Sequence, residues 1–367
     1  MITDDAELAE LLPGLEDSPW IAVDTEADSL HSYPEKLCLI QLSFAGGDRL
    51  VDPLASLSLE PLIELLSTRE LLLHGADFDL RLLRRTQGFV AGAVFDTMLA
   101  ARLLGFEKFG LRDLARDLLD VHLDKGSQRA NWSRRPLTPR MIDYAIADTR
   151  HLEPLASQLR EQLAELGRLE WHKESCARLV AACQEVSEPD PDRVWRIKGS
   201  SRLDRRSLAV LRAIWHWREG EAVARNRPPY FVVSHENLLG IAKRSQEDAA
   251  PLPEALRPRQ RREVAAEVQR ALALPPEELP NRDVSPRPPR LGPDLRRRVD
   301  ELRTRRDTIA EELAINPTLI ANKAELTGLA ERPAEQAAAM MSWQRSLLGL
   351  GAPSVRRHGD GAAGCAK

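Results

Sequence analysis

Two carboxylates close the first apolar stretch of the chain, Ile21-Ala22-Val23-Asp24-Thr25-Glu26, whose leading residues favour a β-strand. Side chains alternate faces along a strand, so Asp24 and Glu26 are expected to point to the same side. Two neighbouring anions repel each other unless a cation, a proton or solvent neutralises them. The pair therefore indicates a divalent metal site that needs further ligands, although an Asp-x-Glu pair also occurs at solvated strand ends.

Further acids come from two predicted helices. Asp79 follows a leucine-rich strand at the start of a helix, and Asp148 lies four residues after Tyr144, on the same helix face. Each is unremarkable alone, because an Asp early in a helix usually caps it or interacts with its dipole. Asp77 is an alternative to Asp79, but the spacing from His74 favours Asp79.

The elements that must position these acids form an α/β domain with a mixed sheet flanked by helices. Apolar, β-prone runs predict strands over 20–24, 37–44, 49–52, 70–74 and 90–95. Helices are predicted over 4–17, 59–67, 96–104 and 111–119. Thr138-Pro139 begins a helix that we expect to run to about residue 166 and to continue to residue 185.

The second half of the chain is predicted to be all-helical. Its last helices are expected at 294–314, 316–328 and 334–348, and segments 231–239 and 314–326 look like weakly related copies. We therefore predict an α/β domain with a connecting helix over 1–186, two small helical domains over 203–283 and 293–350, and a disordered tail over 351–367.

Composition excludes several classes of protein. The chain is 43% hydrophobic and 29% charged, and no apolar run approaches the ~20 residues of a membrane span. The acidic start lacks the form of a signal peptide, so a cytoplasmic location is expected. Four scattered cysteines without a C-x-x-C pair predict neither a disulfide framework nor a zinc site. The sequence contains no phosphate-loop motif of the form G-x-x-x-x-G-K-[ST], so no motif points to a helicase.

Charge is unevenly distributed along the chain. Residues 1–184 carry 20 Lys and Arg against 30 Asp and Glu, whereas residues 185–310 carry 26 against 20. The acidic segment 1–184 could bind cations, and the basic segment 185–310 could bind an anion such as nucleic acid. Ordinary solvated helix faces would give the same excess of basic residues.

Taken together, the ordered motifs resemble a known family. Asp24-Thr-Glu26, His74-Gly-Ala-Asp-Phe-Asp79 and Tyr144-Ala-Ile-Ala-Asp148 are similar to the three motifs of the DEDD exonucleases with a Tyr in the third motif. The segments starting at Cys38, Phe95, Leu111 and Trp132 resemble further blocks of that family. The helical halves resemble the HRDC domains that follow the nuclease domain in the ribonuclease D family. Ala27 and Asn131 depart from the pattern without replacing a ligand.

The resemblance implies a ribonuclease H-like fold and a metal-dependent 3′→5′ exoribonuclease that releases 5′-mononucleotides from RNA, tRNA precursors above all. It implies two Mg²⁺ or Mn²⁺ ions bound by Asp24, Glu26, Asp79 and Asp148, with Asp24 between them and Asp79 acting through water. Tyr144 would orient the attacking water, because a phenol is a poor base at neutral pH. A monomer is expected.

Three points stay open at this stage. Arg129, Trp132 and Arg135 lie in an Arg-rich loop that could contact nucleic acid, or the loop could be packed on the sheet by Trp132. The same carboxylates would serve a DNA 3′→5′ exonuclease. A nucleic-acid-binding protein with an inactive nuclease fold is the non-enzymatic alternative, although such a protein has no reason to keep four repelling carboxylates.

Overall fold

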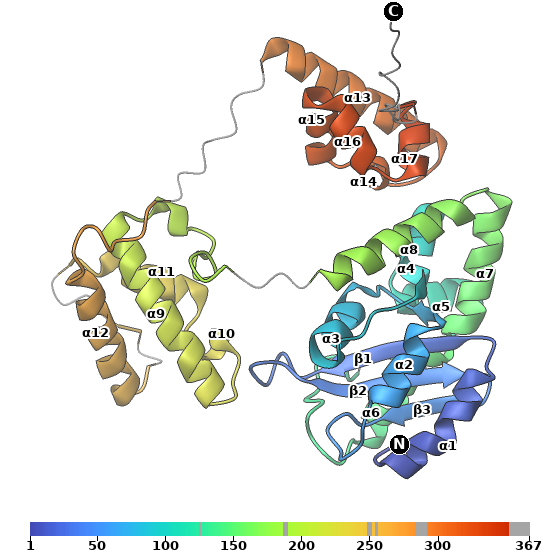
Figure 1. The fold of residues 1–367 in the computed structure, drawn as a ribbon, viewed down its shortest axis with the longest axis horizontal. Helices are drawn as coiled ribbons and strands as arrows, with labels where there is room; N and C mark the ends of the chain where they lie inside the picture. The colour runs from blue at the N-terminus through green and yellow to red at the C-terminus, as the bar shows by residue number, and fades with distance from the viewer. Residues whose placement is uncertain (125, 186–189, 248–251, 254–255, 283–291, 352–367) are drawn as a thin grey trace, which may run out of the picture.

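The computed structural model describes residues 1–124, 126–185, 190–247, 252–253, 256–282 and 292–351 (Figure 1). Most of the predicted tail, 352–367, lies outside the described residues, as do 186–189 between the α/β domain and the first helical unit and 283–291 between the two helical units. In the described ranges, no helix combines the length and the apolar character that a membrane span requires.

A five-stranded mixed sheet forms the centre of the first domain, in the order β3-β2-β1-β4-β5. The strands are β1 (Ile21–Ala27), β2 (Leu37–Phe44), β3 (Gly47–Val51), β4 (Glu70–Leu73) and β5 (Ala93–Asp96). β1 is antiparallel to β2 and parallel to β4, so the strand that carries Asp24 and Glu26 is central. The predicted α/β fold with a mixed sheet is confirmed.

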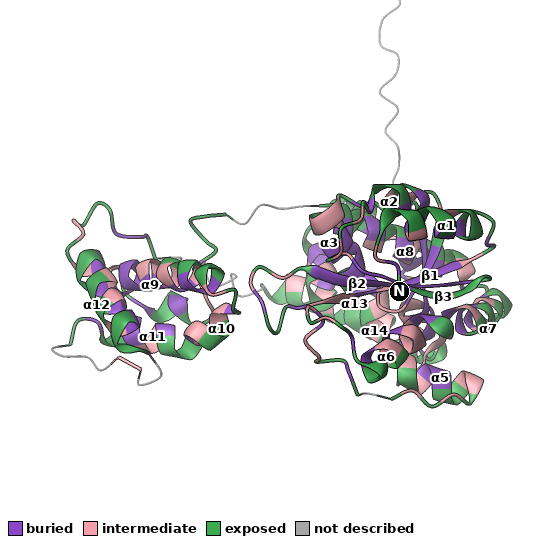
Figure 2. Ribbon diagram, turned by 90° about the horizontal axis from the view of Figure 1, so that it is seen from below, coloured by how far each residue is buried: buried purple, intermediate pink, exposed green. Residues whose placement is uncertain are grey.

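Helices cover both faces of this sheet (Figures 1 and 2). One face, with Ile21 and Val23, packs on α1 (Asp5–Glu16), α2 (Glu60–Ser67), α3 (Asp77–Gln87) and α8 (Leu169–Gln184). The opposite face, with Ala22, packs on α4 (Thr97–Leu104), α5 (Leu111–Leu119) and α7 (Leu152–Glu165). Because side chains alternate, Asp24 and Glu26 belong to the Ala22 face, where α6 (Pro139–Arg150) also packs.

Two boundaries predicted from the sequence are wrong. β1 runs through Ala27, so both carboxylates lie inside the strand and not at its end, because β2 pairs with it along this whole length. The long helix predicted from residue 138 to residue 185 is three helices, α6, α7 and α8. The chain turns at His151 and again at Gly167, whose φ of +66° suits glycine.

The first helical unit has a core of its own. It contains α9 (Arg205–Ala224), α10 (Pro229–Val232), α11 (His235–Arg244) and α12 (Pro258–Leu272), preceded by a short 3₁₀ turn (Ser200–Arg202). The buried side chains include Trp195, Leu208, Ile214 and Val264, and among the described residues the cluster they form has no member from the sheet domain.

The last helical unit instead shares its core with the sheet domain. It comprises α13 (Pro293–Glu312), α14 (Pro317–Ile320), α15 (Lys323–Glu331), α16 (Pro333–Ala339) and α17 (Ser342–Leu347), which replace the two helices predicted after residue 314. Its Ala310, Ile320 and Leu326 belong to one apolar cluster with Phe95 and Leu155.

Two contacts mark the seam between these units. Trp171 of α8 stacks on Trp343 of α17, with ring centroids 5.0 Å apart and an interplanar angle of 13°. The Arg168 guanidinium donates to the carbonyl oxygens of Leu103 at 2.7 Å and Leu313 at 2.9 Å, one on each side of the seam. A buried cation thus satisfies two helix ends that would lack partners without it.

Replacing Arg168 with Met should therefore destabilise the protein by about 1.5–3 kcal/mol. The hydrogen bonds from the charged guanidinium are lost, and the carbonyl oxygens of Leu103 and Leu313 are left without this donor. Urea unfolding at neutral pH measures the change. Arg178→Met is the control, since this arginine is half exposed and reaches Glu325 only at 4.0 Å. Equal stability of the two variants would contradict the role given to Arg168.

Candidate active site

One cavity of about 560 Å³ contains all five residues that the sequence singles out for chemistry. Its wall includes Asp24, Glu26, Asp79, Tyr144 and Asp148. These residues come from β1, from the first turn of α3 and from α6, so three separate parts of the chain must fold before the site exists.

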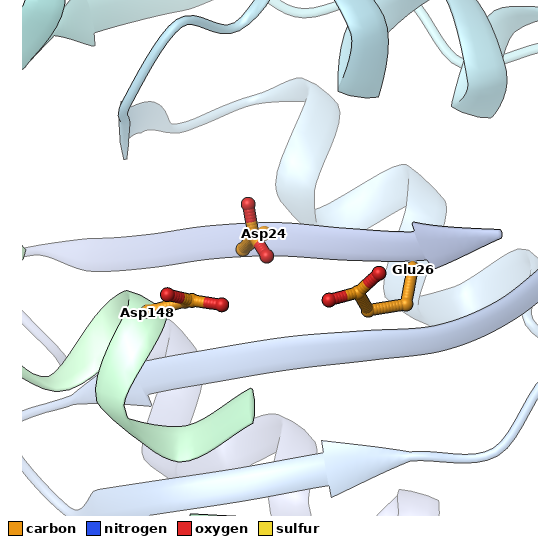
Figure 3. A group of neighbouring side chains, drawn as sticks. All are labelled: Asp24, Glu26 and Asp148. Atoms are coloured by element: carbon orange, nitrogen blue, oxygen red, sulfur yellow. The ribbon is translucent and has the colours of Figure 1, made fainter. Parts of the chain in front are cut away.

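Three of the carboxylates converge at one point. Asp24, Glu26 and Asp148 each offer one oxygen, and these oxygens all lie within 4.8 Å of one another. In Figure 3 the Asp148 side chain extends from its helix toward the strand that carries the other two. An all-oxygen group with this spacing suits a hard divalent cation such as Mg²⁺ or Mn²⁺.

Asp24 is oriented by a residue that the sequence motifs did not assign. Gln41 lies opposite Asp24 in the β1–β2 ladder, and its Nε2 donates a hydrogen bond of 3.2 Å to Asp24 Oδ2. The Gln41 side chain is fully buried, so its amide is held in place. This neutral donor fixes the carboxylate without cancelling its charge.

Asp79 stands slightly apart from the other three. Its Oδ1 accepts hydrogen bonds from the backbone N–H of Thr25 at 3.0 Å and from the Thr25 hydroxyl at 2.6 Å. Asp79 is buried, whereas Asp77 has 59% of its side chain exposed and pairs with Arg81. The structure therefore places Asp79, and not Asp77, in the cavity, tied to the strand residue between Asp24 and Glu26.

The electrostatics of the site are those of anions without a counter-charge. Burial, and then repulsion between the carboxylates, raises the pKa of Asp24 well above its usual value and that of Glu26 to about 9. Burial is also the main cause that raises the pKa of Asp148 to about 7 and of Asp79 to about 6. Within the described chain, no cationic side chain is among the groups that lower these pKa values. The donor set thus fits divalent cations, which would supply the missing charge.

Tyr144 is held as a hydrogen-bond donor. Burial, followed by the nearby charges of Asp148, Glu26 and Asp24, raises the pKa of its phenol, and the phenol donates to Asp148. Its ring packs against Trp132, with centroids 6.1 Å apart. A phenol that stays protonated can orient a water molecule or a phosphate oxygen but cannot take up a proton.

The Arg-rich loop is packed on the sheet around Trp132, which contradicts the predicted nucleic-acid contact of that residue, whereas the predicted contact of Arg135 stays a prediction. Trp132 is 1% exposed and packs in a core with Leu39 and Met141, so it offers no surface to RNA. The Arg135 guanidinium is held by Asp52 and by the carbonyl oxygens of Cys38 and Trp132. Arg129 is exposed and stays a prediction.

Several cavity residues carry no assignment from the sequence. Phe78 is 48% exposed, although it precedes the buried Asp79, and it lines the wall together with His74 and Leu111. Arg112 and Gln128 are exposed and line the same cavity. The sequence did contain a signal for Phe78 and Arg112, because both lie inside motifs that resemble the family. Whether their side chains face the cavity depends on their exposure in the fold, which the motifs do not give.

A mixed sheet with four carboxylates in one cavity, three of them converging, and a tyrosine on a late helix defines a 3′→5′ exonuclease domain. Family models agree: that of the 3′-5′ exonuclease matches residues 1–164 and that of the HRDC domain matches residues 207–271.

Relatives along the whole chain identify the family. The ribonuclease D of Gluconacetobacter diazotrophicus is 33% identical over 95% of this chain and 90% of its own length. That of Granulibacter bethesdensis is 32% identical over 97% and 92%. The crystal structure of Escherichia coli RNase D superposes with a TM-score of 0.72 at 26% identity, covering 95% of this chain and 98% of that one. This chain belongs to the ribonuclease D family, and its activity is that of a 3′→5′ exoribonuclease.

The raised pKa values predict how the metal-free protein responds to pH. Folding makes ionisation of Glu26 harder, since its pKa rises from 4.5 to about 9, so its contribution to stability is lost as the pH rises through this range. In EDTA at pH 8, Glu26→Gln should therefore raise the free energy of unfolding by about 1–3 kcal/mol. At pH 4 the two proteins should unfold alike.

Chemical denaturation at both pH values measures this difference. Glu10→Gln, an exposed carboxylate on α1, is the matched control and should change little. A Glu26→Gln variant that is less stable than the unsubstituted protein in EDTA at pH 8 would show that Glu26 is not repelled by its neighbours.

Proposed function

We propose that this protein trims the 3′ ends of structured RNA precursors, tRNA precursors among them, and releases 5′-mononucleotides with the help of two Mg²⁺ or Mn²⁺ ions. The observation that carries the proposal is the convergence of Asp24, Glu26 and Asp148 beside Asp79, without a counter-charge from the described chain. The substrate class rests on similarity: the E. coli structure is described as that of an exoribonuclease involved in structured RNA processing.

The carboxylates of the chain would divide the work by position. By similarity to the family, Asp24 would face both ions, and Glu26 and Asp148, whose oxygens lie within 4.8 Å of an Asp24 oxygen, would complete the site of one of them. One carboxylate oxygen of Asp79 accepts hydrogen bonds from Thr25, and Asp79 lies outside the group of three. It would therefore contact an ion through water. When bound, the two ions would lower the pKa of the attacking water and stabilise the leaving 3′-oxygen. Tyr144 would orient that water through its phenolic hydrogen.

Two side chains on the cavity wall could hold the terminal nucleotide of a strand. Phe78 offers a ring that is half exposed inside the cavity, where the terminal base could stack. Arg112 on the same wall offers a guanidinium for a phosphate. Both contacts are compatible with RNA and with DNA, so a direct comparison of the two substrates belongs in the first experiment.

The organisation of the whole chain is part of the proposal. We keep the nuclease domain with its connecting helix at 1–186 and the helical domains at 203–283 and 293–350. Both helical units begin with a 20-residue helix and continue with a four-residue helix and then a helix of nine or ten residues, which supports a common plan. We also expect a monomer, because the three domains of one chain supply the full set of candidate ligands and need no partner for it.

The first test is digestion of a 5′-labelled single-stranded RNA, and of the matched DNA, with Mg²⁺, Mn²⁺ or EDTA. The RNA should shorten stepwise from its 3′ end only when metal is present. Asp24→Asn should lower the rate more than about a thousand-fold, equivalent to ~4 kcal/mol of barrier, because the central ligand is lost. Asp77→Asn, two residues from Asp79 but outside the cavity, should stay active.

The outcomes separate the alternatives. RNA that binds in a gel shift but is not cut by the unsubstituted protein would favour a binding protein with an idle nuclease fold. Equal or faster cleavage of DNA would favour a DNA exonuclease. Full activity of Asp24→Asn would contradict the proposal that Asp24 binds the two catalytic ions.

Removing the Phe78 ring should weaken substrate binding more than chemistry. Phe78→Ala is expected to raise KM for RNA about ten-fold, since stacking on one base contributes ~1–3 kcal/mol, with kcat much less affected. Steady-state kinetics measure both constants. Phe78→Tyr keeps an aromatic ring and should behave like the unsubstituted protein, whereas an unchanged KM in Phe78→Ala would rule out stacking there.

A further inference from the structure

His74 lies in the wall of the active-site cavity but has no part in the chemistry assigned above. It follows β4 directly, and its side chain is half-buried. Among the described residues, the group that could hold a metal ion consists of three carboxylates and does not include His74. The imidazole is therefore available for contact with the substrate itself.

The backbone that carries this ring is held in place by Asp96. Its buried carboxylate accepts hydrogen bonds from the backbone N–H groups of Gly75 at 3.0 Å and Ala76 at 2.9 Å. Gly75 has a φ of +73°, and a Cβ at this position would lie 3.1 Å from Met98 Cε, so the turn favours glycine. The ring is thus presented in a fixed position, which lowers the entropic cost of binding a substrate group.

One nitrogen of the ring is already used inside the protein. His74 Nδ1 lies 2.9 Å from Oγ1 of Thr97, which is fully buried at the start of α4. The Thr97 hydroxyl has a single hydrogen, and it donates this hydrogen to the carbonyl oxygen of Leu73 at 3.1 Å. Thr97 therefore accepts from His74, and the proton of the neutral imidazole is on Nδ1.

The other nitrogen, Nε2, is left as a hydrogen-bond acceptor. Burial lowers the pKa of His74, and the charge of Asp96 opposes this effect only in part, so the ring is neutral at neutral pH. When Nδ1 carries the proton, Nε2 has a lone pair and no hydrogen. Within the described ranges, no group of the protein is hydrogen-bonded to Nε2. The ring thus offers the cavity an acceptor whose donor has to come from the substrate.

An acceptor at this place selects among the groups of a nucleic acid. Phosphate oxygens also accept hydrogen bonds, so they suit the Arg112 guanidinium on the same wall and not Nε2. The remaining donors are base N–H groups, which differ between bases, and the hydroxyls of the sugar. The 3′-hydroxyl is common to RNA and DNA, whereas the 2′-hydroxyl is present in every nucleotide of RNA and absent from DNA.

We propose that His74 Nε2 accepts a hydrogen bond from the 2′-hydroxyl of one of the last two nucleotides of the bound RNA, so that His74 favours RNA over DNA. This inference rests on the proposed function and deepens it, because it names a group by which the same site distinguishes its substrate. Thr97 holds the ring in the tautomer that the contact requires. A 2′ substituent that can only accept does not replace the hydroxyl.

The first measurement changes only the substrate. The full-length protein is given 5′-labelled RNAs with a 2′-deoxy or a 2′-fluoro group at the last nucleotide or at the one before it. At one of these positions both groups should lower kcat/KM about ten-fold, equivalent to ~1.4 kcal/mol, because Nε2 loses its donor. Fluorine keeps the sugar conformation of RNA but cannot donate. Cleavage of both 2′-fluoro substrates at the rate of unmodified RNA would overturn the proposal.

The second measurement removes the acceptor. The ratio of kcat/KM for unmodified RNA to kcat/KM for the sensitive 2′-fluoro RNA should fall from about ten to about one in His74→Phe, which keeps a ring without nitrogen. His74→Gln keeps a carbonyl oxygen that can accept and should restore part of the ratio. His216→Phe, which replaces an exposed histidine on α9 outside the cavity, is the matched control and should keep the ratio near ten.

Thr97→Val tests how the ring is oriented. This variant removes the hydroxyl that fixes the tautomer of His74, so it should also lower the ratio. A purely structural loss would slow the cleavage of both substrates equally and leave the ratio at about ten. The ratio therefore reports on the contact with the 2′-hydroxyl and not on the stability of the variants.

The outcomes distinguish this inference from the proposed function. A ratio that stays near ten in His74→Phe would give the ring a structural role, or a role as an acid on the leaving oxygen, and would overturn the proposal. Absence of RNA cleavage by the unsubstituted protein would overturn the proposed function instead. Fluorescence anisotropy with the same RNAs and Asp24→Asn would then decide the role of His74: weaker binding of the 2′-fluoro RNA supports it, and equal binding overturns it.

Discussion

The concentration of buried negative charge is the constraint on which the rest of the structure depends. Four carboxylates line one cavity, and burial together with mutual repulsion makes each of them harder to ionise than in water. A fold that only needed stability would replace them, because uncompensated buried charge is costly. The sheet, the helices around it and the hydrogen bonds of Gln41 and Thr25 all hold this unfavourable arrangement in place. The donors are neutral, so the carboxylates stay oriented but remain free to attract cations.

Much of the site could be predicted because its spacing is local. Alternation along a strand places Asp24 and Glu26 on one side, and one helical turn places Tyr144 next to Asp148. The convergence of these pairs with Asp79 depends on the sheet order, which short-range periodicity does not contain. Only the resemblance of several ordered motifs grouped these residues, which line one cavity in the structure.

The features that the sequence missed are those decided by burial and by long-range contacts. An Arg-rich loop suggests a surface that binds RNA, yet Trp132 fills a core and Arg135 is used on Asp52. The breaks at His151 and Gly167 were hidden by continuous apolar spacing, because packing against the sheet requires the helix to change direction there. Phe78 shows the converse: apolar residues are usually assigned to the core, and only the fold reveals one facing the cavity.

The two helical units show how one helical plan can serve different mechanical purposes. The last unit shares an apolar core with the nuclease domain, and Arg168 and the Trp171–Trp343 stack join the two at their seam. The first unit has its own core, and its contacts with Tyr33 of the nuclease domain are polar hydrogen bonds near the surface. Polar contacts of this kind contribute little net free energy and can be exchanged for water. The first unit is therefore attached to the nuclease domain by contacts that can break without exposing an apolar core.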